Sequence, residues 1–188
     1  MILTKTFDDG LTRCGWLNDD LTYRDYHDQE WGTKTTGQAA LFEGICLEGF
    51  QAGLSWLTIL KRREGFRNAF HGFDVERVAA MNDSDVEVLM QDSSIIRNRA
   101  KINSAIRNAR VVLDQNLDLT ELLWSFAPRV ALTPAKDFAW RATSSESDAM
   151  SKKLRKLGFG FVGSTTMYAL MQSTGMIQDH APGCFRRP

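Results

Sequence analysis

Glu48 places a carboxylate in the most apolar stretch of the chain, where such a group can recognise a ligand that donates hydrogen bonds. Within residues 39–60 the only charged residues are Glu43 and Glu48. A buried carboxylate is unfavourable unless it is paired, protonated or bound to a donor. A Glu48 that caps the following helix or turns toward solvent is an equally open interpretation. The stretch predicts two buried helices, with a break near Glu48 marked by Gly49 and Gly53.

Two cysteines and two histidines could form a metal site that joins the two ends of the chain. Twelve residues separate Cys14 from His27, and three separate His180 from Cys184. Either spacing lets two side chains meet one tetrahedral ion, and thiolates combined with imidazoles favour zinc. Four protein ligands leave no position for an activated water, so one zinc ion there would be structural. The pairs lie far apart in sequence, and unrelated core residues remain the alternative.

Aromatic side chains gather near the start of the chain, around a helix predicted at residues 21–31. Tyr23 shares one face of this helix with Tyr26 and His27, which follow it by three and four residues. Trp16 precedes the helix, and the residues between them include Asn18, Asp19 and Asp20, which are typical helix caps. Such a face can form a stacking pocket for a flat ligand, and rings that only line the core are the other interpretation.

A glycine-rich segment, residues 158–163, predicts a tight turn between two helices. The first helix starts at a capping-box pattern and covers Ser145–Leu157, and the second begins with Ser164 and Thr165. Glycine allows a turn that larger side chains would block, and the free N–H groups at the start of the second helix can hold a phosphate. An ordinary helix-turn-helix packing corner fits the same pattern.

The remaining pattern predicts an all-α fold in a single domain. The chain has 188 residues, of which 43% are hydrophobic, and this suits one globular domain with a sizeable core. Residues 1–12 have no periodic pattern and are expected to form a loose tail before a domain of residues 13–188. Trp140 falls in the least regular segment and receives no role. Further helices are expected at residues 67–70, 75–81, 85–91, 95–113 and 119–126.

The formal net charge is zero, so no general attraction to polyanions follows from the total. No apolar run approaches the roughly 18 residues of a membrane span, and no signal-peptide pattern is present, which predicts a cytoplasmic protein without membrane contact. Segregated basic residues fit a nucleic-acid contact surface, although such runs are more often solvated helix faces. These residues are Arg97, Arg99, Lys101, Arg107 and Arg110, followed by Lys152, Lys153, Arg155 and Lys156.

Together these residues resemble the DNA-3-methyladenine glycosylase I family, bacterial enzymes that excise 3-methyladenine. The resemblance covers nearly everything after residue 12. It implies a helix-hairpin-helix glycosylase fold, with two helical lobes around a base-binding cleft and a structural zinc ion held by the four cysteines and histidines named above. The matching segments are RCGW from Arg13, YHDQEWG from Tyr26, LEGFQAGLSW from Leu47, IIRNRAKI from Ile95, WSF from Trp124, GFGFVG from Gly158 and DH from Asp179.

The resemblance also implies how a methylated base would be read. A base inside a duplex must be flipped into a pocket before an enzyme can reach it. Tyr23 and Trp56 would stack on the purine. Trp16 would line the pocket, and Tyr26 would hydrogen bond near Glu48. Because 3-methyladenine in DNA is cationic, aromatic rings attract it, and Glu48 would accept a hydrogen bond from its exocyclic amino group. Glu48 is therefore the candidate catalytic and base-reading residue.

The family's reaction implies a monofunctional enzyme that releases the base and leaves an abasic site, without a lysine nucleophile. The methylated base is already activated for departure, and Asp179 is interpreted as structural. We expect a monomer acting on alkylated double-stranded DNA. Gly53 and Leu54 would wedge into the gap left by the flipped base. The residues expected to hold phosphate are Gly160, Gly163, Ser164 and Thr165.

Two other classes remain open on the sequence. A non-catalytic, zinc-stabilised DNA-binding protein would use the glycine-rich turn and the basic faces, but it would not need Glu48 beside aromatic residues. A zinc hydrolase would need an open coordination position, and four protein ligands argue against one.

Overall fold

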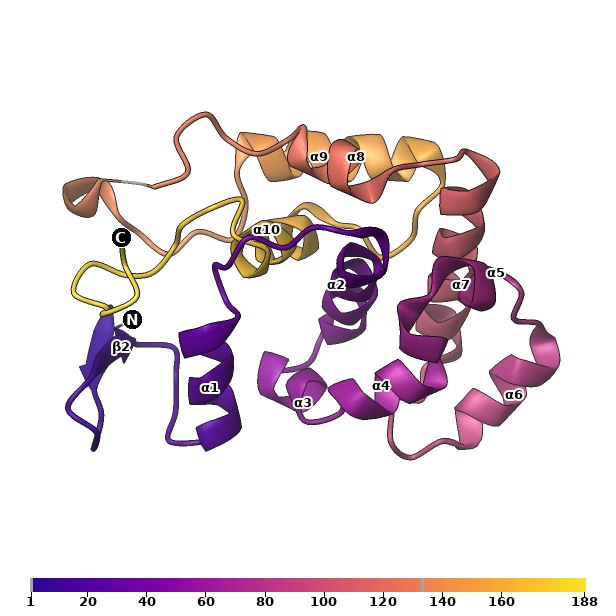
Figure 1. Cartoon of the computed structure of the whole chain (residues 1–188), viewed down its shortest axis with the longest axis horizontal. Helices are drawn as coiled ribbons and strands as arrows, with labels where there is room; N and C mark the ends of the chain where they lie inside the picture. Colours follow the sequence, from indigo (N-terminus) through magenta and orange to yellow (C-terminus); the bar gives the residue numbers. More distant parts are fainter. Residues whose placement is uncertain (1, 133) are drawn as a thin grey trace.

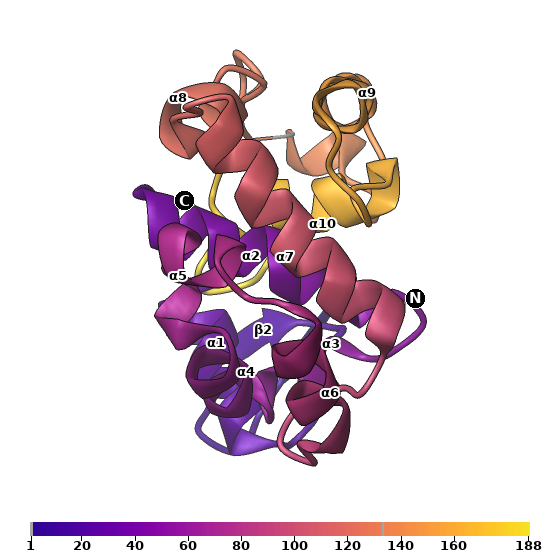
Figure 2. The ribbon, with the colours of Figure 1, turned by 90° about the vertical axis from the view of Figure 1, so that its right-hand side faces the viewer.

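The computed structural model describes residues 2–132 and 134–188, and it places α2 and α10 side by side at the centre of a helical fold (Figures 1 and 2). Two short strands, β1 and β2, lie near the N-terminus. The elements are β1 (Thr4–Thr6), β2 (Thr12–Cys14), α1 (Leu21–Gln29), α2 (Gln38–Gln51), α3 (Trp56–Leu60), α4 (Arg63–Ala69), α5 (Val75–Ala79), α6 (Asp83–Gln91), α7 (Arg99–Asp114), α8 (Leu119–Trp124), α9 (Ser145–Leu157) and α10 (Ser164–Ser173), with 3₁₀ turns at His71–Phe73 and Ala135–Asp137.

The first residues form a β-hairpin in place of the expected loose tail, and the fold is otherwise mostly helical, as the sequence predicted. β1 pairs antiparallel with β2, and Thr4 lies opposite Cys14. Phe7 is buried in the connecting turn, and Arg13 on β2 forms an ion pair with Asp28 of α1 at 2.7 Å. Strands of three residues are too short to show a two-residue hydrophobic period, which explains why the sequence pattern did not indicate them.

α2 occupies the centre of the core because its circumference is almost entirely apolar. The helix continues through Gly49 to Gln51, so the break expected near Glu48 lies further on, at residues 52–55. Gly53 in that turn has a φ of +84°, a left-handed conformation that glycine adopts without strain. Glu48 therefore belongs to the last full turn of α2, and the following turn projects Leu54 into solvent.

α7 begins later than its hydrophobic stripe suggested, because Asn98 caps it by accepting a hydrogen bond from the Lys101 N–H at 3.2 Å. The basic residues in and before this helix do not form one surface. Lys101 is buried, Arg99 pairs with Glu87 at 2.6 Å, and Arg110 donates to two carbonyl oxygens at the end of α5. The basic residues of α9 are all exposed, as expected for a solvated or DNA-facing side.

α9 and α10 meet at the expected tight turn. Gly158 ends α9 in the left-handed conformation, with a φ of +106°. A Cβ at Gly160 would lie 2.3 Å from the Ser104 hydroxyl oxygen, so only glycine lets the turn approach α7 this closely. The capping box at the start of α9 is formed by Ser144 and Ser147, one residue earlier than predicted. The other expected helices are present, with ends displaced by a few residues.

The C-terminal segment packs against the N-terminal hairpin, where the Phe185 N–H donates a hydrogen bond to the carbonyl oxygen of Thr12 at 2.8 Å. A small second cluster of buried side chains lies where they meet α1, and it contains Cys14, Tyr26, Trp31, Ala181 and Cys184. Within the described residues, no helix combines the length and apolar character that crossing a membrane would require.

Candidate functional site

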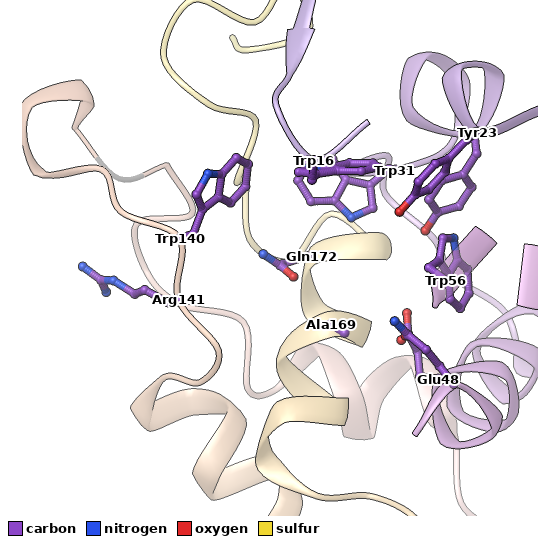
Figure 3. Close-up of a pocket in the computed structure, with 11 residues that line it drawn as sticks. Trp16, Tyr23, Trp31, Glu48, Trp56, Trp140, Arg141, Ala169 and Gln172 are labelled. Carbon is purple, nitrogen blue, oxygen red and sulfur yellow. The ribbon is translucent and has the colours of Figure 1, made fainter. Parts of the chain in front are cut away.

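An aromatic cavity of about 240 Å³ lies between α1, α2, α3 and α10. Every residue proposed from the sequence to bind a base lies on its wall. In Figure 3, the Glu48 side chain extends into it from α2, and Trp140 lies on the opposite side from Tyr23 and Trp56. The lining residues are Trp16, Tyr23, Tyr26, Trp31, Glu48, Gln51, Trp56, Trp140, Arg141, Ala169 and Gln172.

The aromatic rings of the cavity pack against one another in tilted and edge-to-face arrangements. Trp16 lies 5.1 Å from Tyr23 and 5.2 Å from Trp31, measured between ring centres. Tyr26 lies 5.4 Å from Trp56. The helix face that carries Tyr23 and Tyr26 therefore forms one wall of the cavity.

Glu48 is 5% exposed and accepts a hydrogen bond from the Ser173 hydroxyl at 3.3 Å. Burial raises the pKa of its carboxyl group to about 8, and the Ser173 hydrogen bond offsets only part of this effect. Burial raises the pKa of Tyr23 to about 12 and that of Tyr26 well above its usual value, and the charge of Glu48 adds to both shifts. The site thus holds a carboxylate that gains from any ligand that donates to it.

Glu48→Gln is expected to stabilise the folded protein at alkaline pH. The carboxyl pKa is higher in the folded state, about 8 against 4.5 for a glutamate in water, so the folded state binds the proton more tightly. The wild type should therefore lose stability relative to the variant as pH rises from about 4.5 to about 8. Urea unfolding of both proteins at pH 5 and pH 8.5 measures the difference, and a constant difference in unfolding free energy would contradict it.

Several lining residues were not found from the sequence. Gln51 follows Glu48 by three residues, so it shares a helix face with Glu48 and could have been inferred. Ala169 and Gln172 have the same spacing on α10. Trp140 comes from an irregular segment whose position depends on tertiary contacts, including an edge-to-face contact with Phe138 at 5.1 Å. Local periodicity carries no signal for such a residue.

A second groove of about 200 Å³ adjoins the cavity and extends along the turn after α2. It is lined by Glu48 and Gln51, which also line the aromatic cavity, and by the predicted wedge and hairpin residues Gly53, Leu54 and Thr165. The other predicted phosphate-binding residues, Gly160, Gly163 and Ser164, belong to the turn and first residue of α10 outside this groove. Glu48 thus lies where the two cavities meet.

Cys14, His27, His180 and Cys184 come together in the second buried cluster, and their ligand atoms all lie within 4.8 Å of one another. The Cys184 sulfur lies 3.5 Å from His27 Nε2 and 3.6 Å from His180 Nδ1. The contact between the thiols lowers the pKa of Cys184 and raises that of Cys14. This group could hold a metal ion.

The two imidazoles are oriented through their other nitrogens. His27 Nδ1 lies 2.7 Å from a carboxylate oxygen of Asp28, which Arg13 holds in place. His180 Nε2 lies 3.1 Å from the carbonyl oxygen of Trp31. Metal-binding histidines commonly have such partners, which fix the tautomer and direct the free nitrogen toward the ion.

Comparison with known proteins connects these sites to one family. A family model described as methyladenine glycosylase matches residues 16–187. DNA-3-methyladenine glycosylase 1 of Escherichia coli (strain K12) is 50% identical over 181 residues, which cover 93% of this chain and 96% of that protein. DNA-3-methyladenine glycosylase of Haemophilus influenzae is 44% identical over 178 residues, which cover 92% of this chain and 96% of that protein.

Solved structures give the same result. A crystal structure of 3-methyladenine DNA glycosylase I superimposes with a TM-score of 0.88 at 47% identity, covering 94% of this chain and 100% of that one. A structure of the Staphylococcus aureus glycosylase, reported for its recognition of 3-methyladenine, has a TM-score of 0.83 at 31% identity and covers 91% of this chain and 94% of its own. The matches extend over nearly the whole length, and the chain belongs to the methyladenine glycosylase family.

Proposed function

We propose that this chain is a monofunctional DNA glycosylase that flips 3-methyladenine out of alkylated double-stranded DNA and hydrolyses its N-glycosidic bond. The observation that carries the proposal is Glu48, a buried carboxylate in an aromatic cavity that also opens onto the groove beside Leu54. A non-catalytic DNA-binding protein has no need of a carboxylate that is buried at an energetic cost in such a cavity.

Recognition combines ring stacking with one charged hydrogen bond. The cationic methylated base is attracted to the ring faces of Tyr23 and Trp56. An uncharged adenine would gain less from this cation–π interaction. Glu48 accepts a hydrogen bond from the exocyclic amino group, and Tyr26 and Trp16 close the cavity around it. The Trp56 indole N–H is buried without a hydrogen-bond partner in the described part of the chain, and it can donate to an acceptor on the base.

DNA is held on both sides of the cavity opening. Gly53 and Leu54 enter the space left by the flipped nucleotide, because their turn is exposed and adjoins the groove that leads to Glu48. The first residues of α10 offer backbone N–H groups to a phosphate. Together with the aromatic cavity, these contacts fit two helical lobes around one base-binding cleft, and we infer a single-domain monomer that acts in the cytoplasm.

Asp179→Asn is expected to lower stability while leaving excision within about threefold of wild type, because Asp179 is engaged in the core. Its carboxylate is buried and accepts hydrogen bonds from the Tyr168 hydroxyl at 2.7 Å and from Gln172 Nε2 at 2.8 Å. Losing one such bond costs about 1 to 3 kcal/mol of stability. Thermal unfolding and single-turnover excision measure the two effects. A hundredfold loss of excision in a folded variant would instead make Asp179 catalytic.

We also propose that one zinc ion is bound by Cys14, His27, His180 and Cys184 and acts structurally. Zn–S and Zn–N bonds of ordinary length place a sulfur and a nitrogen about 3.6 Å apart across a tetrahedron. The corresponding distances here are 3.5, 3.6 and 3.7 Å, which supports a tetrahedral ion of this size. The ion would join β2 and α1 to the C-terminal segment and so fix one wall of the aromatic cavity.

Release of free base from methylated duplex DNA, identified by chromatography, tests the proposed function directly. The wild type should release 3-methyladenine and leave an abasic site without strand cleavage. Tight binding of methylated DNA with no base release would favour the non-catalytic DNA-binding protein. A metal-dependent hydrolase would lose activity in proportion to metal removal even while its fold stayed intact.

A further inference from the structure

Lys101 is a buried lysine whose ammonium group is bound to the end of α2. The side chain is 9% exposed in total, and Nζ donates hydrogen bonds to the carbonyl oxygens of Phe50 at 2.9 Å and Ala52 at 2.7 Å. A cation at the C-terminus of a helix interacts favourably with the helix dipole and with carbonyl groups that lack partners within the helix. Burial lowers the pKa of Lys101, so its position carries a desolvation cost.

The carbonyl groups that Lys101 binds lie at the base of the exposed turn after α2. Ala52 is the first residue beyond the helix, and Gly53 and Leu54 follow it. Leu54 is a large apolar side chain that is 41% exposed. Because Nζ bridges the last turn of the helix and the first residue of the loop, it fixes the direction in which the chain leaves α2. The position of the Leu54 side chain depends on that direction.

The same lysine lies against the turn between α9 and α10. Its Nζ lies 6.0 Å from the centre of the Phe161 ring, and Lys101, Gly49, Gly160 and Phe161 line one small crevice. A Cβ at Gly49 would lie 3.2 Å from the Phe161 Cβ, so this turn packs directly on the last turns of α2. Lys101 therefore lies where the turn that carries Leu54 meets the turn that leads into α10.

We propose that Lys101 is a positioning residue that holds the Leu54 turn and the α9–α10 turn in one fixed arrangement, so that Leu54 enters the duplex while α10 holds the DNA backbone. This inference rests on the proposed glycosylase function. It assigns Lys101 to duplex opening and not to the chemistry of the base, because the lysine lines neither the aromatic cavity nor the adjoining groove. Loss of its charge should affect the use of duplex DNA and spare the base cavity.

Arg110 provides a matched control for simple helix capping. It lies on the same helix, α7, and donates to the carbonyl oxygens of Ala79 at 3.0 Å and Met81 at 2.6 Å, at the end of α5. Arg110→Met therefore removes the same kind of contact from a part of the fold that borders neither cavity. Lys101→Met and Arg110→Met should both lower thermal stability, and only the first should alter the handling of DNA.

The experiment compares Lys101→Met, Leu54→Ala, their double variant and Arg110→Met at a temperature where all are folded. Single-turnover excision from methylated duplex DNA should fall about tenfold in Lys101→Met and in Leu54→Ala, a factor equivalent to about 1.4 kcal/mol. The excision rate of the double variant should equal that of the more impaired single variant, because the Leu54 side chain is already misplaced once Lys101 is replaced. Binding of free 3-methyladenine, followed by tryptophan fluorescence, should stay within about twofold of wild type in every variant.

Lys101→Arg separates the charge from the exact side chain, because a guanidinium can also donate to two carbonyl oxygens. It should recover part of the duplex excision that Lys101→Met loses. The inference is overturned if Lys101→Met excises at the wild-type rate, if Leu54→Ala has no effect, if the two losses multiply, or if free-base binding falls as much as excision. A wild type that releases no 3-methyladenine would refute the proposed function itself, which is a different result from any of these.

Discussion

Glu48→Gln is expected to lower single-turnover excision of 3-methyladenine from duplex DNA by about 30- to 150-fold, because a hydrogen bond to a charged group contributes about 2 to 3 kcal/mol. The amide can still accept through its oxygen, but it lacks the negative charge that faces a cationic base. Glu48→Ala removes the acceptor as well and should lose more. Both variants should keep the fold, because burial disfavours the ionised form of Glu48 and raises its pKa to about 8, so the free protein gains little from this carboxyl group.

Glu43→Gln is the matched control for this prediction. Glu43 lies on the same helix and pairs with Arg67 at 2.9 Å, away from the aromatic cavity. Its replacement should change stability and leave excision within a few-fold of wild type. If both Glu48 variants excise 3-methyladenine at a near-normal rate, Glu48 does not read the base. An equal loss in Glu43→Gln would show that the effect is a general one on α2.

Glu48 is unfavourable for stability but suited to ligand recognition, and this is why the sequence alone can indicate it as a functional residue. Glu48 is buried, and the only hydrogen bond to it in the described structure is the one from Ser173, so the folded state gains little from a carboxylate at this position. A ligand that donates to the carboxylate recovers that cost. The sequence already contains this conflict, since one acid stands in an apolar run, but the location of the aromatic partners requires the fold.

Residues were predictable from sequence to the extent that local spacing determines their environment. That Tyr23 and Tyr26 lie on one helix face follows from helical periodicity alone, and both line the cavity. The metal group was only one of two interpretations, because nothing local brings Cys14 to His180 across the length of the chain. The N-terminal hairpin was missed because its strands are too short to show a hydrophobic period, and tertiary contacts such as the Arg13–Asp28 ion pair hold it in place.

The environment of Lys101 could not be predicted from the sequence. Its neighbours in sequence made it one of several basic residues on a solvated face, and the hydrophobic stripe of α7 gave no reason to treat it differently. Burial of its ammonium group depends on the carbonyl groups of Phe50 and Ala52, which lie in another helix and its following turn. Whether a charged side chain can be buried depends on the groups that hydrogen bond to it, and for Lys101 these groups are distant in sequence.

Removal of the proposed zinc ion is expected to weaken both the fold and base binding. Protein purified without chelator should contain about one zinc per chain, and Cys184→Ser or treatment with a strong chelator should remove it. A ligand present at about 1,000 times its dissociation constant stabilises the folded state by about 4 kcal/mol, which corresponds to a melting temperature about 10 °C higher for a chain of this length. Metal analysis and thermal unfolding measure the two quantities together.

Base binding should fall with the metal because its ligands hold the aromatic wall. The His27 ring centre lies 5.4 Å from that of Trp16, and the His180 ring centre lies 4.7 Å from that of Trp31, so both imidazoles of the metal group contact aromatic residues that line the cavity. Cys46→Ser is the control, since Cys46 is equally buried but lies in the main core, apart from the metal group. It should lose stability and keep its zinc. A zinc content near zero in the wild type, or unchanged free-base affinity after zinc removal, would mean that the four side chains fix this wall by packing alone.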